Sequence, residues 1–322
     1  MVSYTIGRSA PDVHAKWGCL QRISPGGDLS PTLLHVTPWG ELRIRLHEGS
    51  HGCGERAGHG MWIAVGKGKG GAGCTTAVLE LAYAAARRRR GRRPRRVGVI
   101  DLDPQGNATD VLEPESRSLG IKDVLNPHSP LSLRDVLVPA SWERILVAPA
   151  DRFLANREVD ITARGITALR RARLSGEIDD LVDDVIIDLP RDVGKLAATG
   201  LLGAETLFIA AQATMWGAQG AEEMRYTAER ISAKGNPDLR IAGFIISAYD
   251  DARDSKRVLN EMKENFGEKV ILPPIPRRVR VREAIESYHT PCREYGGEDL
   301  VEVSDIYQSV YDRSQEAREN LK

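Results

Sequence analysis

Apolar residues follow two alternating patterns along most of the chain. Short continuous apolar runs, the first of them at residues 62–65, predict buried strands. The segment that follows this first run has apolar residues at helical spacing, which predicts an amphipathic helix over residues 75–90 with one buried face. Later apolar runs predict further strands at residues 97–100, 145–149, 185–188, 208–211 and 244–246.

This alternation of strands and helices indicates the α/β class. Strands that are apolar without interruption are typical of a parallel sheet covered on both faces. We therefore expect a doubly wound, mostly parallel twisted sheet with helices on both faces, formed by residues 61–322.

Residues 1–60 differ from the rest of the chain in composition and in periodicity. They are rich in Gly, Pro, His and Ser and show little helical periodicity, so we expect a poorly ordered extension. A β-hairpin between residues 33–36 and 42–46 is one possibility, and translation starting at Met61 is another. Four side chains in this segment form a candidate zinc site, although a solvated linker is the simpler interpretation; they are His47, His51, Cys53 and His59.

Composition limits the candidate functions. Lys and Arg together number 45, as do Asp and Glu, so binding to nucleic acid must depend on local patches and not on net charge. The four cysteines form no disulfide framework, which fits a reducing cytoplasm. No stretch is long and apolar enough to span a bilayer, so we expect a cytoplasmic protein with no membrane partner.

Five glycines between residues 66 and 73 separate the first strand from the first helix. Backbone N–H groups of such a loop, together with the helix dipole, form a site for phosphate. A dinucleotide pattern G-x-G-x-x-G fits Gly66, Gly68 and Gly71. The nucleoside triphosphate pattern G-x-x-x-x-G-K-[ST] also fits, except that Cys74 occupies its lysine position.

Three blocks resemble the ParA-type partition ATPases, which have a deviant Walker A motif. The loop K-G-G-A-G-C-T-T at residues 69–76 matches the family's K-G-G-x-G-K-T-T at all but one fixed position. Residues 101–109 read D-L-D-P-Q-G-N-A-T, as in the family, and residues 184–190 resemble its Walker B strand. The resemblance covers about residues 61–312 and implies ATP and Mg²⁺ as ligands.

The resemblance also implies roles for particular residues. Lys69 would reach the partner's phosphates across a nucleotide-sandwich dimer, and Asp103 would orient or deprotonate the attacking water. Thr75 and Asp188 would hold the magnesium ion. The remaining nucleotide contacts would come from Gly70, Gly71, Ala72, Gly73, Cys74, Thr75, Thr76, Ser247, Pro276 and Arg277.

Cys74 is the main departure from the family pattern. Loss of a charged hydrogen bond of this kind costs about 1.5–3 kcal/mol, or about ten- to a hundredfold in affinity. Turnover should suffer more than binding, because the lysine also neutralises charge that develops in the transition state. Lys67 is a possible substitute.

Two basic segments are candidates for contact with DNA. Residues 87–96 contain eight arginines. These cations either face the dipole at the end of the first helix or contact the phosphates of DNA. The second zone would lie on the side that faces DNA in the family, and it consists of Arg253, Lys256, Arg257, Arg278 and Arg280.

The resemblance therefore predicts a protein of plasmid or chromosome partition. Such a protein dimerises on ATP, binds DNA without sequence specificity, associates with the nucleoid and responds to a ParB-like centromere-binding protein. With Cys74 in the loop, hydrolysis is expected to be weakened. A nucleotide-dependent regulatory switch without hydrolysis and a dinucleotide-binding enzyme of the Rossmann type are the alternatives.

Overall fold

The structure is a computed structural model that describes residues 18–20, 32–36, 42–45, 60–68, 70–87, 89 and 91–319. It divides into two compact units, Met1–Ala57 and Gly58–Lys322. The predicted zinc ligands lie outside the described residues, as does Lys69.

The first unit contains a small antiparallel sheet. Its strands are β1 (Gly18–Leu20), β2 (Thr32–Val36) and β3 (Leu42–Arg45), in the order β1-β2-β3. The hairpin predicted from the alternating pattern is present, because β2 pairs with β3 in the register Leu34↔Ile44.

The second unit is built on a seven-stranded sheet in the order β10-β9-β4-β8-β5-β7-β6. Neighbouring strands are parallel except for the short edge strand β6, which runs antiparallel to β7. The strands are β4 (Trp62–Lys67), β5 (Val97–Asp101), β6 (Val138–Pro139), β7 (Ile145–Ala148), β8 (Asp184–Asp188), β9 (Thr206–Gln212) and β10 (Arg240–Ser247).

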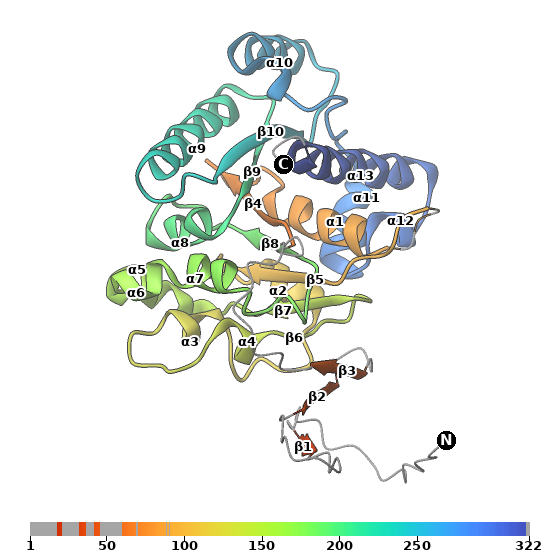
Figure 1. The fold of residues 1–322 in the computed structure, drawn as a ribbon. Coiled ribbons are helices and arrows are strands. Elements are labelled where there is room, and N and C mark those ends of the chain that lie inside the picture. Colours follow the sequence, from red (N-terminus) through yellow and green to blue (C-terminus); the bar gives the residue numbers. More distant parts are fainter. Residues whose placement is uncertain are drawn as a thin grey trace. The chain divides into compact units, whose positions relative to one another are not determined.

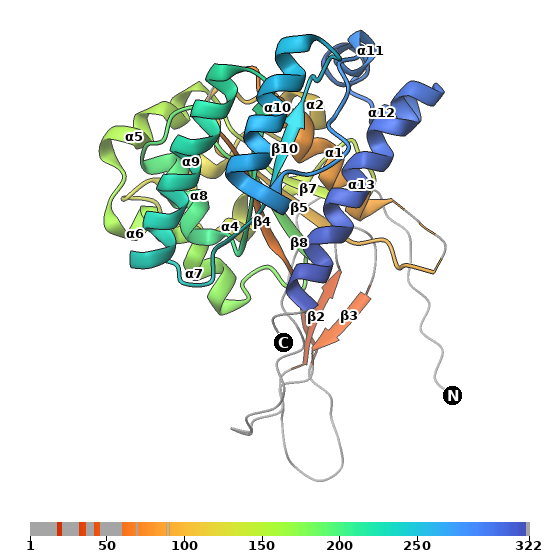
Figure 2. The same cartoon turned by 90° about the horizontal axis from the view of Figure 1, so that it is seen from above.

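Helices cover both faces of this sheet (Figures 1 and 2). On one face α1 packs against α13, and on the other α8 packs against α7 and α9. The α-helices are α1 (Cys74–Ala86), α2 (Asn107–Leu112), α3 (Ile121–Leu125), α4 (Leu133–Val136), α5 (Arg157–Asp160), α6 (Ala163–Ile166), α7 (Ala168–Ser175), α8 (Lys195–Gly203), α9 (Met215–Lys234), α10 (Arg253–Phe266), α11 (Val279–Arg282), α12 (Cys292–Tyr295) and α13 (Glu298–Glu319). Short 3₁₀ turns at Arg152–Asn156 and Gly267–Lys269 and a π turn at Glu283–Ser287 complete the unit. The predicted doubly wound α/β fold is therefore confirmed.

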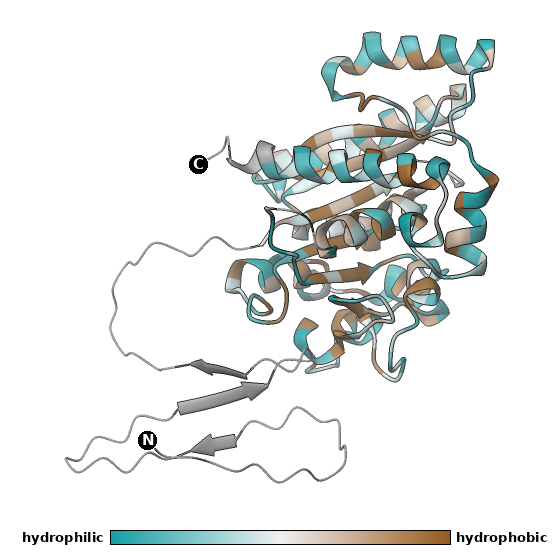
Figure 3. Cartoon of the chain, turned by 90° about the vertical axis from the view of Figure 1, so that its right-hand side faces the viewer, coloured by the Kyte–Doolittle hydropathy of each residue, from teal (hydrophilic) through white to brown (hydrophobic). Residues whose placement is uncertain are grey.

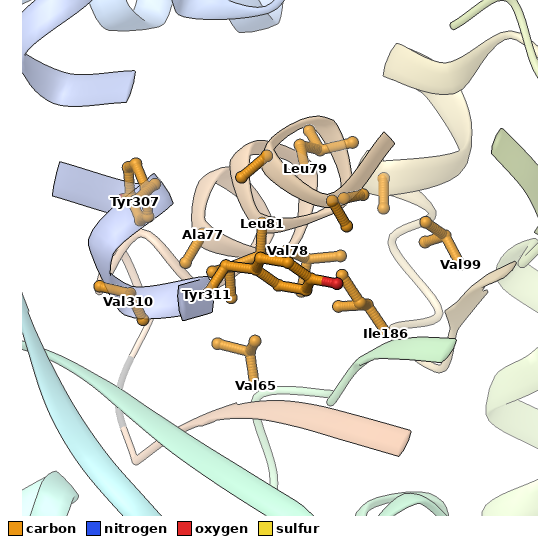
Figure 4. Packing of buried hydrophobic residues seen from close by; sticks show 14 of the residues in the cluster. Val65, Ala77, Val78, Leu79, Leu81, Val99, Ile186, Tyr307, Val310 and Tyr311 are labelled. Carbon is orange, nitrogen blue, oxygen red and sulfur yellow. The ribbon is translucent and has the colours of Figure 1, made fainter. Parts of the chain in front are cut away.

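The continuous apolar runs form the central strands because both faces of those strands are buried. In Figure 3 the strands are coloured as hydrophobic, and the outer helices alternate between hydrophilic and hydrophobic turns. Ile63 and Val65 of β4 contribute to the core beneath α1 and α13. Figure 4 shows Val65 and Ile186 of the sheet near Val78 of α1 and Tyr311 of α13. This packing fixes the start of α1 directly above the end of β4.

The first helix is shorter than predicted, since α1 ends at Ala86 and not at residue 90. Arg87 is already extended, and Gly91 has a positive φ of 77°. The arginines that follow are bound by carboxylates instead of continuing the helix. Among the described residues of the run, every arginine pairs with an acid: Arg87 with Asp305, Arg89 and Arg92 with Asp312, Arg95 with Asp184, and Arg93 and Arg96 with Asp183.

Candidate nucleotide-binding site

Polar side chains from four parallel strands meet at the carboxyl edge of the sheet. Lys67 ends β4, Asp101 ends β5, Asp188 ends β8 and Ser247 ends β10. The register brings the two acids together, because Asp101 pairs with Asp188 across neighbouring strands. In open α/β sheets this edge is where ligands bind.

The glycine loop between β4 and α1 leaves little room for side chains. Gly71 and Gly73 have φ values of 79° and 74°, which favour glycine. A Cβ atom on Gly68 would lie 1.8 Å from the carbonyl oxygen of Gly220 in α9, so the backbones approach closely here. The first two of these glycines give the loop a turn that other residues adopt only with strain, and the third lets α9 pack against it.

Two side chains from neighbouring strands hold the loop from outside. Gln212 donates its amide N–H to the Gly71 carbonyl at 2.7 Å, and Ser247 donates its hydroxyl to the Ala72 carbonyl at 2.6 Å. With its carbonyls bound in this way, the loop is fixed to β9 and β10.

The residues predicted to hold magnesium are hydrogen-bonded to each other. The Thr75 hydroxyl donates to Asp188 Oδ2 at 2.8 Å. The Cys74 thiol lies 3.2 Å from Asp188 Oδ1 and 3.1 Å from the carbonyl oxygen of Val65. A hydroxyl and a carboxylate are hard oxygen donors of the kind that Mg²⁺ prefers, whereas the thiol is not such a ligand.

Lys67 and Asp103 form a buried ion pair. Lys67 Nζ lies 3.1 Å from Asp103 Oδ2, and both side chains are less than a tenth exposed. The other carboxylate oxygen of Asp103 accepts the backbone N–H of Gln105. Asp103 is thus held at the start of the loop that follows β5.

Burial and neighbouring charge shift the pKa values of this cluster. Burial lowers the pKa of Lys67, but neighbouring negative charges, among them the carboxylates of Asp188 and Asp103, outweigh it, and the net shift is upward. Burial first, and the charge of Asp188 second, raise the pKa of Cys74 well above its ordinary value. At neutral pH, therefore, Lys67 is a cation and Cys74 is a neutral thiol.

The buried acids have raised pKa values as well. Burial and the charge of Asp188 raise the pKa of Asp101 to about 7, against the hydrogen bonds from Thr109. Burial likewise raises the pKa of Asp188, while Lys67 and the hydrogen bonds from Thr75 and Cys74 act in the opposite direction. Burial and the proximity of carboxylates therefore disfavour negative charge at this edge of the sheet.

The residues predicted near the base come from two adjoining segments. Tyr249, two residues after Ser247, forms an isolated parallel β-bridge with Pro276. The Arg277 N–H donates to the Tyr249 carbonyl at 2.7 Å. Ser247, Pro276 and Arg277 therefore lie along one edge beside the loop, although the Ser247 hydroxyl is already donated to Ala72. Their contact with a base stays a prediction.

Most basic residues of the predicted DNA-binding zone form ion pairs within the chain. Four of its cations have acidic neighbours, in the pairs Lys256–Asp251, Arg257–Asp254, Arg278–Glu302 and Arg280–Asp299. Arg253, at the start of α10, is exposed. Two of these pairs join residues close together in the sequence, and two join Arg278 and Arg280 to acids of α13. The basic residues alone did not indicate that they would be paired with acids.

Sequence reasoning missed two side chains that lie against the loop, Gln212 and Arg191. Arg191 follows the second acidic strand, and a Cβ on Gly70 would lie 3.0 Å from its guanidinium carbon. Arg191 could have been predicted from its position just after the strand that ends at Asp188, because residues that follow parallel strands line the edge where ligands bind.

Across the described residues, no group of three or more His, Cys, Asp and Glu side chains is placed to hold a metal ion. A magnesium ion at this edge would thus depend on Thr75, Asp188 and ligands that the nucleotide and water supply. Within the same residues, no helix is both long and apolar enough to cross a membrane.

The parallel sheet, the glycine loop before α1 and the Thr75–Asp188 pair define a P-loop nucleotide-binding protein. The family model AAA_31, described as an AAA domain, matches residues 60–241. The chain therefore belongs to this family, and its relatives place it among the ParA-type P-loop ATPases. This assignment supports the nucleoside triphosphate pattern of the two phosphate-loop patterns.

Three similar proteins illustrate the relationship. The chromosome partitioning protein ParA of Caulobacter vibrioides is 32% identical over 197 residues, covering 59% of this chain and 72% of that protein. The chromosome-partitioning ATPase Soj of Thermus thermophilus is 33% identical over 211 residues, covering 65% and 78%. The crystal structure of cobyrinic acid a,c-diamide synthase from Mycobacterium smegmatis, with an ATP analog and magnesium bound, has a TM-score of 0.63 at 27% identity and covers 79% and 93%.

Proposed function

We propose that this protein binds ATP with Mg²⁺ and acts as a ParA-like component of plasmid or chromosome partition. The observation that carries the proposal is the hydrogen bond of 2.8 Å between Thr75 and Asp188 at the end of a constrained glycine loop. The names of the relatives, and the nucleotide and magnesium in the synthase structure, support the same function. Residues 61–322 form the nucleotide-binding domain in this proposal.

Each part of the loop has a role in binding. The N–H groups of residues 70–76 and the dipole of α1 attract the phosphate oxygens. Thr75 and Asp188 would hold Mg²⁺, which offsets the charge of the phosphates when it is bound. The segment with Ser247, Pro276 and Arg277 would contact the base.

Hydrolysis is weakened in this proposal because Cys74 brings no charge to the phosphates. Its thiol is fully buried, and burial keeps it neutral by raising its pKa. Asp103 would orient the attacking water, but its carboxylate is bound to Lys67. A site that binds nucleotide well and turns it over slowly is the expected result.

The partners follow from the family. Binding of ATP would join two copies of the chain, with Lys69 contributing to the partner's site. The dimer would bind DNA without sequence specificity, on the nucleoid in the cytoplasm, and a ParB-like centromere-binding protein would stimulate its release. The neutral net charge requires that DNA contact come from a local surface.

A steady-state ATPase assay with DNA present tests this function. We expect slow turnover by the wild type and at least tenfold faster turnover by Cys74→Lys. Cys74→Ser is the matched control, because it restores no charge and should stay slow. If neither the wild type nor Cys74→Lys hydrolyses ATP, the proposed ATPase activity is refuted.

A second candidate is a nucleotide-dependent switch without hydrolysis, and the neutral Cys74 thiol favours it. The same assay separates the two. Binding of ATP by the wild type with no turnover, together with turnover by Cys74→Lys, would identify the switch.

A further inference from the structure

Lys67 is an unusual residue for the end of a central strand. It is 7% exposed, whereas lysine side chains are almost never buried without a partner. Its structural role is to neutralise Asp103, whose Oδ2 lies 3.1 Å from its ammonium group. Burial of such a pair is costly, so a pair retained at a binding edge invites a functional explanation.

The surroundings of Lys67 are those of the missing loop lysine. Its ammonium group contacts Asp103, and Val65, two residues earlier in β4, pairs with Asp188 in the sheet. The carbonyl oxygen of Val65 also lies 3.1 Å from the Cys74 thiol. Cys74 touches Asp188 as well, at 3.2 Å. Position 74, the first residue of α1, has no cation, but Lys67 at the end of β4 brings one to the same buried cluster.

Phosphate binding needs such a cation. A phosphate tail that enters this edge approaches two buried carboxylates, Asp103 and Asp188, which repel it. An ammonium group has three N–H donors, and the hydrogen bond to Asp103 uses one of them. The other two leave Lys67 able to donate to a phosphate oxygen without giving up Asp103.

We propose that Lys67 replaces the missing loop lysine and donates to the phosphates of the bound nucleotide while it retains its contact with Asp103. This inference rests on the proposed ATP binding and names the residue that makes it work. It also links the two halves of the site: the same ammonium group that attracts phosphate holds the Asp103 carboxylate by a hydrogen bond of 3.1 Å, so this carboxylate is less free to turn toward the attacking water. Binding is thereby rescued while turnover stays slow.

The test is the affinity for ATP with Mg²⁺, measured by titration calorimetry on the full chain. Because removal of Lys67 alone leaves the Asp103 carboxylate buried without its cationic partner, the comparison is made in the background Asp103→Asn, which sets the reference affinity. Adding Lys67→Met should weaken binding at least tenfold. Further addition of Cys74→Lys should restore most of the loss, because it returns a cation from the other side of the loop. Lys234→Met, at the exposed end of α9, is the control for loss of a lysine elsewhere.

The outcomes separate the inference from the function on which it rests. Unchanged affinity on adding Lys67→Met, with the wild type binding ATP, overturns the inference alone. Weakened affinity that Cys74→Lys does not restore also overturns it, since Lys67 would then act only on the local structure. A folded wild type that takes up no ATP overturns both proposals.

Discussion

Thr75 and Asp188 are the two residues whose roles are most directly linked by geometry, because one hydrogen bond of 2.8 Å joins them. Thr75→Ala removes both the hydroxyl donor and the proposed magnesium ligand. We expect the gain in ATP affinity that Mg²⁺ provides to fall about ten- to a hundredfold. Titrations of ATP with and without Mg²⁺ measure this gain, and Thr75→Ser, which keeps the hydroxyl, should behave as the wild type. Equal gains for Thr75→Ala and wild type would remove Thr75 from the metal site.

Asp103 should separate binding from turnover. Asp103→Asn removes the group proposed to orient or deprotonate water, and general-base groups contribute about 10²–10⁴-fold to rate. We therefore expect the residual hydrolysis to fall by at least a hundredfold. Binding of ATP should not weaken, because Lys67 loses its carboxylate partner and can turn fully to phosphate. Single-turnover hydrolysis and equilibrium binding measured on the same sample check both parts, and hydrolysis at the wild-type rate would exclude Asp103 from the chemistry.

At the scale of elements, the docking of α13 on α1 fixes the phosphate loop from behind. Leu300 near the start of α13 is fully buried in this core. Leu300→Ala should lower the free energy of unfolding by about 2–5 kcal/mol through lost burial and a cavity. Denaturant unfolding measures the change, and Leu174→Ala, on the exposed side of α7, should stay within about 0.5 kcal/mol of wild type. A similar small effect for both would contradict the packing of α13.

The elements also show where sequence patterns succeed. The strands at β4, β5, β7, β8, β9 and β10 were predicted because each is a continuous apolar run. The end of α1 at Ala86 was not predicted. The arginines that follow it pair with acids far away in the sequence, among them Asp312, which is 223 residues from Arg89. The partners of the arginine run could not be foreseen from local charge.

At the scale of the whole molecule, the motifs indicated which residues meet at the carboxyl edge but not how they pair. The D-L-D-P block predicted that Asp103 lies beside the loop. Thr75 and Asp188 were predicted to share a magnesium ion, and in the structure they are hydrogen-bonded to each other. The contact between Lys67 and Asp103 joins the end of β4 to the loop after β5, and β8 separates these two strands in the sheet. Its existence depends on how the side chains fill the buried space between them, which no single motif encodes.

We expect DNA binding to come from a local surface and to depend strongly on salt. If the zone around α10 and α11 contacts phosphates, Arg253→Ala should weaken binding and reduce the slope of log affinity against log salt by about 1. Arg257→Ala should have a smaller effect, because Arg257 is already paired with Asp254 and Glu261. Fluorescence anisotropy with duplexes of unrelated sequence, with ATP present, gives both values. An affinity that does not change with salt would contradict binding through phosphate.

In the proposed function, residues 69–76, with magnesium near Thr75 and Asp188, hold the phosphate tail of a nucleotide. Titration calorimetry of the full chain with a non-hydrolysable ATP analogue and Mg²⁺ measures this binding. We expect saturable uptake of one nucleotide per chain that weakens when Mg²⁺ is withdrawn. The absence of any uptake by folded protein at millimolar nucleotide would contradict it.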